Sequence, residues 1–392
     1  METSRAPRAT VRSAPLDWLR GIALLLVLLS HGWALWSTTA LEAVPPVLNV
    51  IRSGNLAVSV FLVVAGFLLT RSLVGSGTRD DDDGRVGVIA AARPVDAVLS
   101  RVVRVSAQVY VLLAVVVLVA LVDPKEILTF GQTMATVGAV ATFTWNWYLQ
   151  TSSPIARPDL GHLWYTAVYV QVTLVLVLLV RSLRHRRLVL LAVVAAVILA
   201  CSVWRPHVAA SEGAYLSLLR TTTRMDGMFW GALVALAWPW LVRARAHATT
   251  IAGWSLLGLV ALTLSIGHSM TYMGWGGVGV NLCVAGFVVA TPGLVDHPRW
   301  VRLTSWSPLV ALGRMSLAVY VWHYPVFMMV ARHGGGWPTL TKVAVSFAVI
   351  ALAVAVTTRW VERPAARLAE RLLRRGGTAP APAEAPVPAP TP

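Results

Sequence analysis

LDWLRGIALLLVLLSHGWALW, residues 16–36, is an apolar run of membrane-spanning length that contains an arginine and a histidine. Ionisable side chains at membrane depth are costly and mark function by default. At about 100° per residue, eleven residues bring His31 to within roughly 20° of Arg20, about 16 Å further along one helix face. Asp17 falls on the same stripe. We interpret this stripe as a polar face turned towards a bundle interior; the alternative is a cationic anchor followed by an interfacial histidine.

The composition is that of a polytopic membrane protein. Of the 392 residues, 57% are hydrophobic and only 13% are charged, with a mean hydropathy of +0.68. The net charge of +16 would suggest a nucleic-acid partner in a soluble chain. Here the arginines flank apolar runs, so membrane orientation and anionic lipid explain them better, and we expect no nucleic-acid partner. Cys201 and Cys283 both lie in apolar segments and form no disulfide framework.

The positive charges decide which apolar segments cross the membrane. Eleven segments are long enough to consider: 16–36, 54–73, 105–122, 132–149, 162–181, 187–204, 215–238, 250–267, 275–293, 308–331 and 338–358. With a cytoplasmic N-terminus, a membrane crossing by 132–149 would place every later arginine-rich loop on the outer side. Without that crossing, all of these loops lie in the cytoplasm. The positive-inside bias therefore predicts ten spans with both termini cytoplasmic. It makes 132–149 a re-entrant or interfacial element at the outer face.

These patterns predict an all-α, polytopic transmembrane helical bundle in three parts. Residues 1–15 are a cytoplasmic N-terminal segment, and 16–362 form the transmembrane domain. Residues 363–392 are a cytoplasmic basic segment with a disordered Pro/Ala-rich tail. The acidic run at 80–83 is interpreted as a solvated linker rather than a cation site.

An arginine pair opens the third span. Arg101 and Arg104 lie at positions i and i+3, on one face of the expected helix. Arginine forks match phosphate geometry, so the pair is suited to clamp a phosphorylated cytoplasmic ligand. Ordinary basic flanking of a span is the alternative.

The sixth span is unusually charged. Arg220, Arg224 and Asp226 fall in its outer half, and a continuous helix would place the two arginines on one face. Such charges predict either a hydrated cavity or a structural ion-pair network.

Further polar residues mark other spans. His162 and Trp164 open the fourth span at the outer face, and Glu362 closes the tenth at the inner face. His323 lies mid-membrane, two residues before Pro325. The proline frees a backbone carbonyl one turn earlier and is expected to kink the helix.

Soluble catalytic signatures are absent. The sequence has no nucleophile elbow, P-loop, HExxH zinc helix or glycine-rich dinucleotide fingerprint. His31, His162 and His323 are residue types that bind zinc, but nothing in their spacing demands it, so we predict no metal.

Seven blocks, in order along nearly the whole chain, resemble the acyltransferase 3 family of integral membrane O-acyltransferases. They are DWLRGIALLLVLLSH, GNLAVSVFLVVAGFLL, RVVR, HLWYTAVYVQ, TTTRMDGMFWGALVAL, LGRMSLAVYVWHYPV and WVERP. The resemblance implies transfer of an acyl group, usually acetyl, from cytoplasmic acyl-CoA, with no other cofactor. The implied acceptor is a hydroxyl of a surface glycan, a lipid-linked sugar or a secondary metabolite, at a bacterial cell membrane.

The resemblance also assigns roles. By the family pattern, Arg20 and His31 are the signature pair, and Arg101 with Arg104 is implicated with the donor. Some relatives carry a C-terminal SGNH-hydrolase domain; we expect none here, because only a short tail follows the last span.

Two positions depart from the family pattern. Tyr169 and Val170 occupy positions where the family often has Glu, and Ala65-Gly66 replaces its Ser-Gly. Both departures bear on the acceptor and on site details more than on the fold.

The residues fit this chemistry independently. A cytoplasmic thioester and an outer hydroxyl must meet inside the bilayer, where His31 is placed to act as general base. Asp17 and Glu362 are candidates to orient the inner guanidiniums, and Arg224 with Asp226 to hold the acceptor. A transporter of an anionic or acyl-modified substrate is the rival hypothesis, because intramembrane Arg and His suit it equally.

Overall fold

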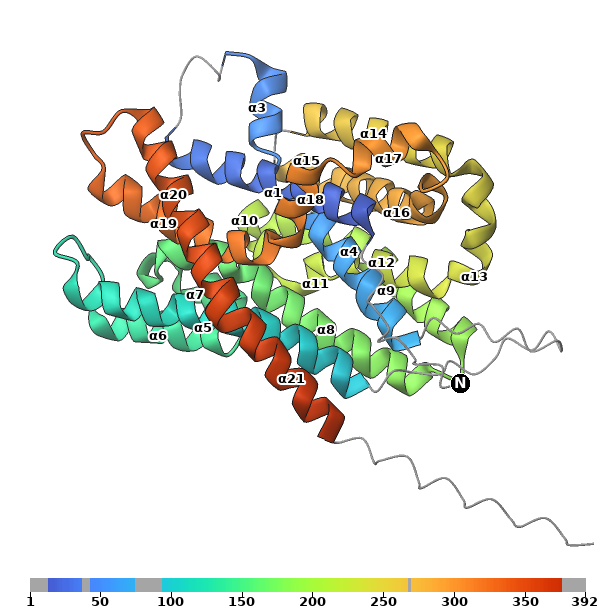
Figure 1. Ribbon diagram of the computed structural model, residues 1–392, viewed down its shortest axis with the longest axis horizontal. Coiled ribbons are helices and arrows are strands. Elements are labelled where there is room, and N and C mark those ends of the chain that lie inside the picture. Colours follow the sequence, from blue (N-terminus) through green and yellow to red (C-terminus); the bar gives the residue numbers. More distant parts are fainter. Residues whose placement is uncertain (1–12, 37–42, 75–93, 267–268, 376–392) are drawn as a thin grey trace, which may run out of the picture.

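The computed structural model describes residues 13–36, 43–74, 94–266 and 269–375 (Figure 1). These residues form helices joined by short turns, and none of them lies in a β-strand. The prediction of an all-α bundle is therefore confirmed. Three expectations concern residues outside the described ranges: most of the segment 1–15, the acidic linker at 80–83 and the Pro/Ala-rich tail from residue 376 onwards.

Eight helices within the described residues are long and apolar enough to cross a membrane. They include α1 (Ala14–Leu35), α4 (Gly54–Val74), α5 (Pro94–Val122), α8 (Trp164–Leu183), α9 (Arg187–Glu212), α14 (Ala248–Ser265), α16 (Gly277–Leu294) and α20 (Thr339–Thr357). They correspond to eight of the ten predicted spans.

The other two predicted spans are divided into shorter helices. Residues 214–236 form α10 (Ala214–Leu219), α11 (Thr221–Arg224) and α12 (Asp226–Leu236); residues 307–333 form α18 (Ser307–Arg314) and α19 (Ser316–His333). Arg220 is extended, with φ −71° and ψ 129°. The expectation that Arg220 and Arg224 share one helix face is therefore wrong, because the helix is interrupted between them.

The remaining helical segments are short, apart from the last. They are α3 (Pro45–Ile51), α6 (Phe130–Ala141), α7 (Trp145–Ser152), η1 (Ser153–Ile155), η2 (Pro158–Leu163), α13 (Trp238–Leu241), η3 (Val242–His247), α15 (Ser269–Thr271), η4 (Tyr272–Gly276), α17 (Pro298–Thr304), η5 (Thr358–Glu362) and α21 (Arg363–Arg375). The segment 132–149 falls in α6 and α7, separated by a turn at Phe143 with φ 55°. Neither helix is among the eight long ones, and the position of this segment at the outer face stays a prediction.

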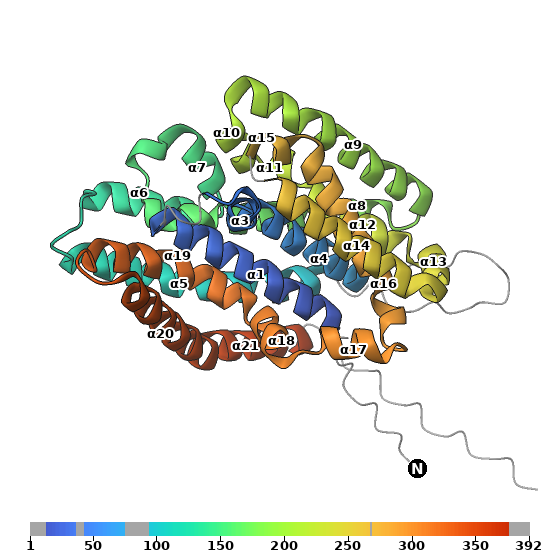
Figure 2. The ribbon, with the colours of Figure 1, turned by 90° about the horizontal axis from the view of Figure 1, so that it is seen from above.

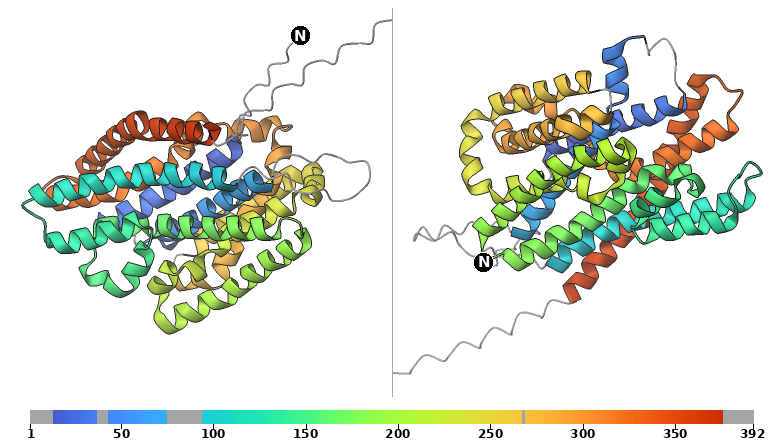
Figure 3. Two further views of the ribbon diagram at one scale, coloured as in Figure 1. Left: turned by 90° about the horizontal axis from the view of Figure 1, so that it is seen from below. Right: turned by 180° about the vertical axis from the view of Figure 1, so that it is seen from behind.

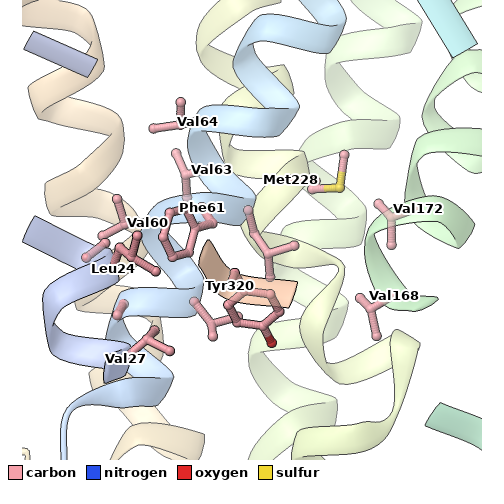
Figure 4. Close-up of a cluster of buried hydrophobic side chains, with 14 of the residues drawn as sticks. Leu24, Val27, Val60, Phe61, Val63, Val64, Val168, Val172, Met228 and Tyr320 are labelled. Carbon is pink, nitrogen blue, oxygen red and sulfur yellow. The ribbon is translucent and has the colours of Figure 1, made fainter. Parts of the chain in front are cut away.

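Two glycines allow α4 and α12 to touch backbone to backbone. A Cβ on Gly66 would lie 2.0 Å from the Met228 carbonyl oxygen, and one on Gly231 would lie 2.0 Å from the Val63 carbonyl oxygen. Small residues at helix interfaces serve this close approach in membrane proteins. Figure 4 shows Val63 and Met228 among the apolar side chains beside this contact. Gly66 of the Ala65-Gly66 pair therefore has a packing role.

Helix α1 runs through the middle of the bundle (Figure 2). It packs against α4, α18 and α19. Gly21 faces the backbone of Leu309, and Gly313 faces the backbone of Asp17, so α18 lies directly on the first turns of α1. As a result α18 and α19 follow the polar stripe of α1 from one end to the other.

Candidate functional site

At the start of α1, the stripe makes a cluster of charges with α18 and α19. Arg20 Nη1 lies 3.4 Å from Asp17 Oδ1, and Arg314 Nε lies 3.3 Å from Asp17 Oδ2. Arg20 Nη2 donates to Ser316 Oγ at 2.8 Å. Asp17 thus orients two guanidiniums, one of which, Arg314, was not among the residues predicted from sequence.

Helix α5 adds the arginine pair at the same end of the bundle. Arg101 Nη2 donates to the Leu68 carbonyl at 3.0 Å, near the end of α4. Arg104 Nε lies 3.6 Å from Glu362 Oε1, and Gln108 Nε2 donates to Glu362 Oε2 at 3.1 Å. These contacts accompany the packing of α21 against α5 (Figure 3). Glu362 therefore orients an arginine of the predicted donor pair. We call Arg20, Arg101, Arg104 and Arg314, with Asp17 and Glu362, the arginine end.

At the other end of the stripe three histidines from α1, η2 and α19 meet. His31 Nδ1 lies 2.7 Å from His323 Nε2. The ring centroids of His162 and His323 are 5.1 Å apart, and those of His31 and His162 are 6.4 Å apart. His162 and His323 are buried, whereas His31 is partly exposed. We call these three residues the histidine cluster.

The hydrogen bonds of the cluster fix its tautomers. His323 Nδ1 lies 2.7 Å from the Tyr320 carbonyl oxygen, which only accepts, so Nδ1 carries the proton. In neutral His323 the Nε2 atom is then an acceptor, and His31 Nδ1–H must be the donor to it. None of the described residues bonds to the Nε2 atom of neutral His31, so its lone pair is free. The network therefore prepares His31 Nε2 to take up a proton.

Pro325 contributes to the cluster through the backbone. Proline has no N–H, so Pro325 cannot donate the usual helical hydrogen bond to the carbonyl of Val321, one turn earlier in α19. That carbonyl accepts from His162 Nε2 at 3.2 Å, while Tyr320 Oη donates to the His162 carbonyl at 2.5 Å. His162 Nδ1 is consequently an unprotonated, buried atom without a partner. The carbonyl expected from the sequence is thus used to position a histidine.

A cavity of about 210 Å³ opens beside the cluster. Ten residues from α1, α4, α8, α10, α19 and the turn before α4 line it: Val27, Ser30, His31, Arg52, Gly54, Asn55, Val58, Trp164, Leu218 and Tyr320. None of the ten is acidic. His31 is the lining residue with the free imidazole lone pair, so a molecule in this cavity meets the candidate base.

Arg224 lies behind one wall of the cavity. Its Nη1 donates to Tyr272 Oη at 2.5 Å, and its Nη2 lies 3.5 Å from the Asn55 carbonyl oxygen. Its guanidinium carbon is 5.6 Å from the Trp164 ring centroid. Arg224 is buried, and no carboxylate among the described residues pairs with it. Trp164, predicted at the outer end of the fourth span, and Arg224, a predicted acceptor residue, therefore adjoin one cavity.

Asp226 is turned away from that cavity. Its carboxylate accepts from Arg205 at 2.6 Å and from Asn281 at 2.9 Å, and all three side chains are buried. The predicted span 187–204 ends just before Arg205, but α9 continues to Glu212 and Arg205 lies inside it. This arrangement is the ion-pair network that was the alternative for the sixth span.

A second buried arginine, Arg157, holds η2 in place. Arg157 pairs with Glu126 at 2.9 Å and with Asp159 at 2.8 Å. Burial opposes its charge, but hydrogen bonds and the charges of Asp159 and Glu126 outweigh this and raise the pKa of Arg157. Because η2 carries His162, this pairing positions the histidine cluster from outside.

The turn after α5 continues this network. Asp123 accepts from Arg332 at 2.9 Å and from His333 at 3.1 Å, both at the end of α19. A hydrogen bond from the backbone N–H of Lys125, followed by the bonds from these two side chains, lowers the pKa of Asp123 to about 2. We call Asp123, Glu126, Arg157, Asp159 and Arg332 the ionic cap.

Some residues that bond to the predicted site residues, or line the cavity with them, are not predicted from the sequence. Tyr320 was not singled out, although it lies three residues before His323 and bonds both buried histidines. Asn55 and Ser30 are polar residues in apolar helices, a signal of the kind used for His31. Among the described residues no group of three or more His, Cys, Asp or Glu side chains is arranged to hold a metal ion.

Comparisons with known proteins match most of the chain to one family. The family model described as "Acyltransferase domain", that of the acyltransferase 3 family, matches residues 14–359. O-acetyltransferase OatA of Staphylococcus aureus is 21% identical over 368 residues, which are 89% of this chain and 56% of that protein. Peptidoglycan O-acetyltransferase OatA of Listeria monocytogenes is 23% identical over 390 residues, covering 92% and 57%.

A third relative, a putative membrane-bound transacylase BcsY of Komagataeibacter xylinus, is 29% identical over 337 residues, covering 80% of this chain and 72% of that one. This chain thus spans little more than half the length of the two OatA relatives. No solved structure matches it.

Proposed function

This chain belongs to the acyltransferase 3 family, and from that premise we propose that it moves an acyl group, usually acetyl, from acyl-CoA to a hydroxyl. The acceptor class we propose is a surface glycan, a lipid-linked sugar or a small metabolite. Two relatives named as O-acetyltransferases support the acetyl group and the hydroxyl. Within the chain, the supporting observation is the His31–His323 hydrogen bond, which leaves His31 Nε2 free beside a cavity.

The chemistry follows from that atom. His31 Nε2 takes the proton of the acceptor hydroxyl as its oxygen attacks the thioester carbonyl carbon. The carbon–sulfur bond then breaks, and the CoA thiolate leaves and takes the proton back as the free thiol. His323 stabilises the imidazolium through the bond to His31 Nδ1, much as an orienting partner does in a catalytic triad. The thioester is already activated, so positioning and one base supply most of what is needed.

The donor is assigned to the arginine end. CoA carries phosphates, and arginine forks bind phosphate through charge-assisted hydrogen bonds. The side chain of Arg104 is 55% exposed and therefore accessible to a soluble ligand. We place this end in the cytoplasm because the arginines of the loops at 181–187, 243–245 and 299–302 follow the positive-inside bias there. The acyl group then has to extend along the α1 stripe towards His31.

A double-label experiment separates this proposal from transport. Purified protein in proteoliposomes receives acyl-CoA labelled differently in its acyl and CoA parts, with and without a glycoside acceptor. We expect free CoA thiol to form and the acyl label to become covalently attached to the acceptor. A carrier would move both labels across the membrane together, unchanged. That result, without thiol release, would contradict acyl transfer and establish the rival function.

A further inference from the structure

The cavity beside His31 contains polar groups that the protein does not satisfy. The Ser30 hydroxyl, the Asn55 side-chain amide and the Arg52 guanidinium all line it, and none of them has a hydrogen bond or ion pair to another described residue. Arg52 is exposed and Ser30 and Asn55 are partly exposed, so these groups remain available to water or to a polar ligand. The cavity, of about 210 Å³, has room for one sugar ring. Available donors and acceptors around such a space suit a polar ligand.

The electrostatics of the cavity specify the sign of that ligand. Arg52 lies in its lining, and buried Arg224 lies behind Asn55 and Trp164. The described partners of Arg224 are a tyrosine hydroxyl, a carbonyl and aromatic rings, none of which carries a negative charge. No acidic residue lines the cavity to offset either arginine. The charge of exposed Arg52 is partly screened by water, whereas the charge of buried Arg224 acts on a ligand through surroundings of lower dielectric.

We propose that this cavity binds one anionic sugar unit of the acceptor. The acceptor hydroxyl points to His31 Nε2, and a carboxylate or phosphate on the same unit pairs with Arg52. Asn55 and Ser30 bond the other hydroxyls, and Trp164 offers an apolar wall to the ring. This assignment rests on the proposed acyl transfer and adds to it the charge of the substrate and the residue that recognises it.

The test compares acceptors that share a pyranose ring and differ in charge: the glucuronide has a carboxylate in place of the 6-hydroxymethyl group, and the phosphate carries its charge on the anomeric oxygen. They are methyl glucoside, methyl glucuronide and glucose 1-phosphate, each assayed for acyl transfer by the protein in nanodiscs. We expect kcat/KM to be at least about tenfold higher for an anionic acceptor than for the neutral one. A preference for the glucuronide identifies an acidic sugar, and a preference for the phosphate identifies a phosphate-linked sugar.

Variants assign the effect to Arg52, which is exposed at the cavity. Arg52→Gln should remove the preference, because the KM for the anionic acceptor should rise much more than the KM for methyl glucoside. Arg52→Lys should restore part of it. Lys342→Gln is the matched control, because it removes one positive charge from the same end of the bundle, at the start of α20.

Two results would overturn the assignment. Equal kcat/KM for neutral and anionic acceptors, or a preference that survives Arg52→Gln, contradicts the anionic subsite while CoA release still supports acyl transfer. If the wild-type protein releases no CoA thiol with any acceptor, the proposed function itself fails, and the subsite fails with it.

Discussion

The two ends of the α1 stripe differ in how they treat charge. At the arginine end, Arg20 and Arg314 share the Asp17 carboxylate and Arg104 lies beside Glu362, and the Arg104 and Arg314 side chains are about half exposed. At the histidine cluster no carboxylate of a described residue contacts the three rings, and the bonds run from ring nitrogen to ring nitrogen or to backbone carbonyls. The first arrangement suits binding a charged, water-soluble ligand, and the second suits taking up a proton at His31.

This difference explains why both ends lie on one helix. A helix holds Arg20 and His31 about 16 Å apart with a fixed phase, so the distance between a donor site and a base is set by the backbone. The same separation keeps the carboxylates away from the base. Each end can then be altered by substitution without direct effect on the other.

The largest effect is expected for the loss of a charge at Asp226, which lies at neither end of the α1 stripe, and it should be seen in thermal stability. Asp226→Asn leaves buried Arg205 without a negative partner, and breaking a buried ion pair costs about 3–5 kcal/mol. We expect a marked fall in thermal stability, with the KM values of the surviving protein unchanged. Asp296→Asn, whose partner Arg245 is half exposed, is the control and should cost less than about 1 kcal/mol. A change in acceptor KM without loss of stability would instead assign Asp226 to the acceptor.

Substitutions in the histidine cluster should lower kcat. His323→Leu removes the acceptor that orients His31, and we expect kcat to fall about 10²-fold, less than the roughly 10⁴-fold loss known for an ionised orienting partner. The KM for acyl-CoA should not change. His323→Gln keeps an acceptor for His31 Nδ1–H and should recover part of the rate. If Leu and Gln variants fold and turn over equally, His323 has only a packing role.

Substitutions at the arginine end should raise the KM for acyl-CoA. Arg104→Gln removes a charge-assisted contact to phosphate worth about 1.5–3 kcal/mol, so the KM for acyl-CoA should rise about tenfold to a hundredfold. The kcat at saturating donor should stay near normal. Arg302→Gln, in α17, is the control for removing an exposed positive charge. Unchanged donor saturation in Arg104→Gln would mean that the pair only flanks a span.

The ionic cap should produce the smallest effect, visible only in acid. The pKa of Asp123 is lowered from about 3.9 to about 2, so its stabilising contribution is present above pH 4 and is lost as the pH falls through 2. We therefore expect the difference in Tm between wild type and Asp123→Asn to shrink from pH 4 to pH 2. A difference that stays constant across this range would show that the Asp123 carboxylate has no lowered pKa.

The sequence could predict what periodicity and charge determine. Helical phase placed Asp17, Arg20 and His31 on one stripe, and the contacts of all three with α18 and α19 agree with it. The chemistry of proline predicted a freed carbonyl, which is the one that His162 uses. Apolar runs of sufficient length gave the long helices.

What the sequence could not supply was pairing between distant segments. Arg205 and Asp226 are 21 residues apart, and Arg157 and Glu126 are separated by α6, α7 and η1, so no local pattern predicts either pair. The sequence also did not predict the break in the helix at Arg220. The spacing of apolar residues does not show where the backbone of a single residue becomes extended. The cavity depends on six separate segments, and no local pattern predicts such a space.

The central claim is that His31 Nε2 is the base that activates the acceptor hydroxyl. The direct test is the rate of acyl transfer by His31→Gln, which keeps polarity and approximate size but takes up no proton. With expression, Tm and donor KM matched to wild type, the account predicts a fall in kcat of about 10²–10⁴-fold. Near-normal turnover by a well-folded His31→Gln protein would contradict it.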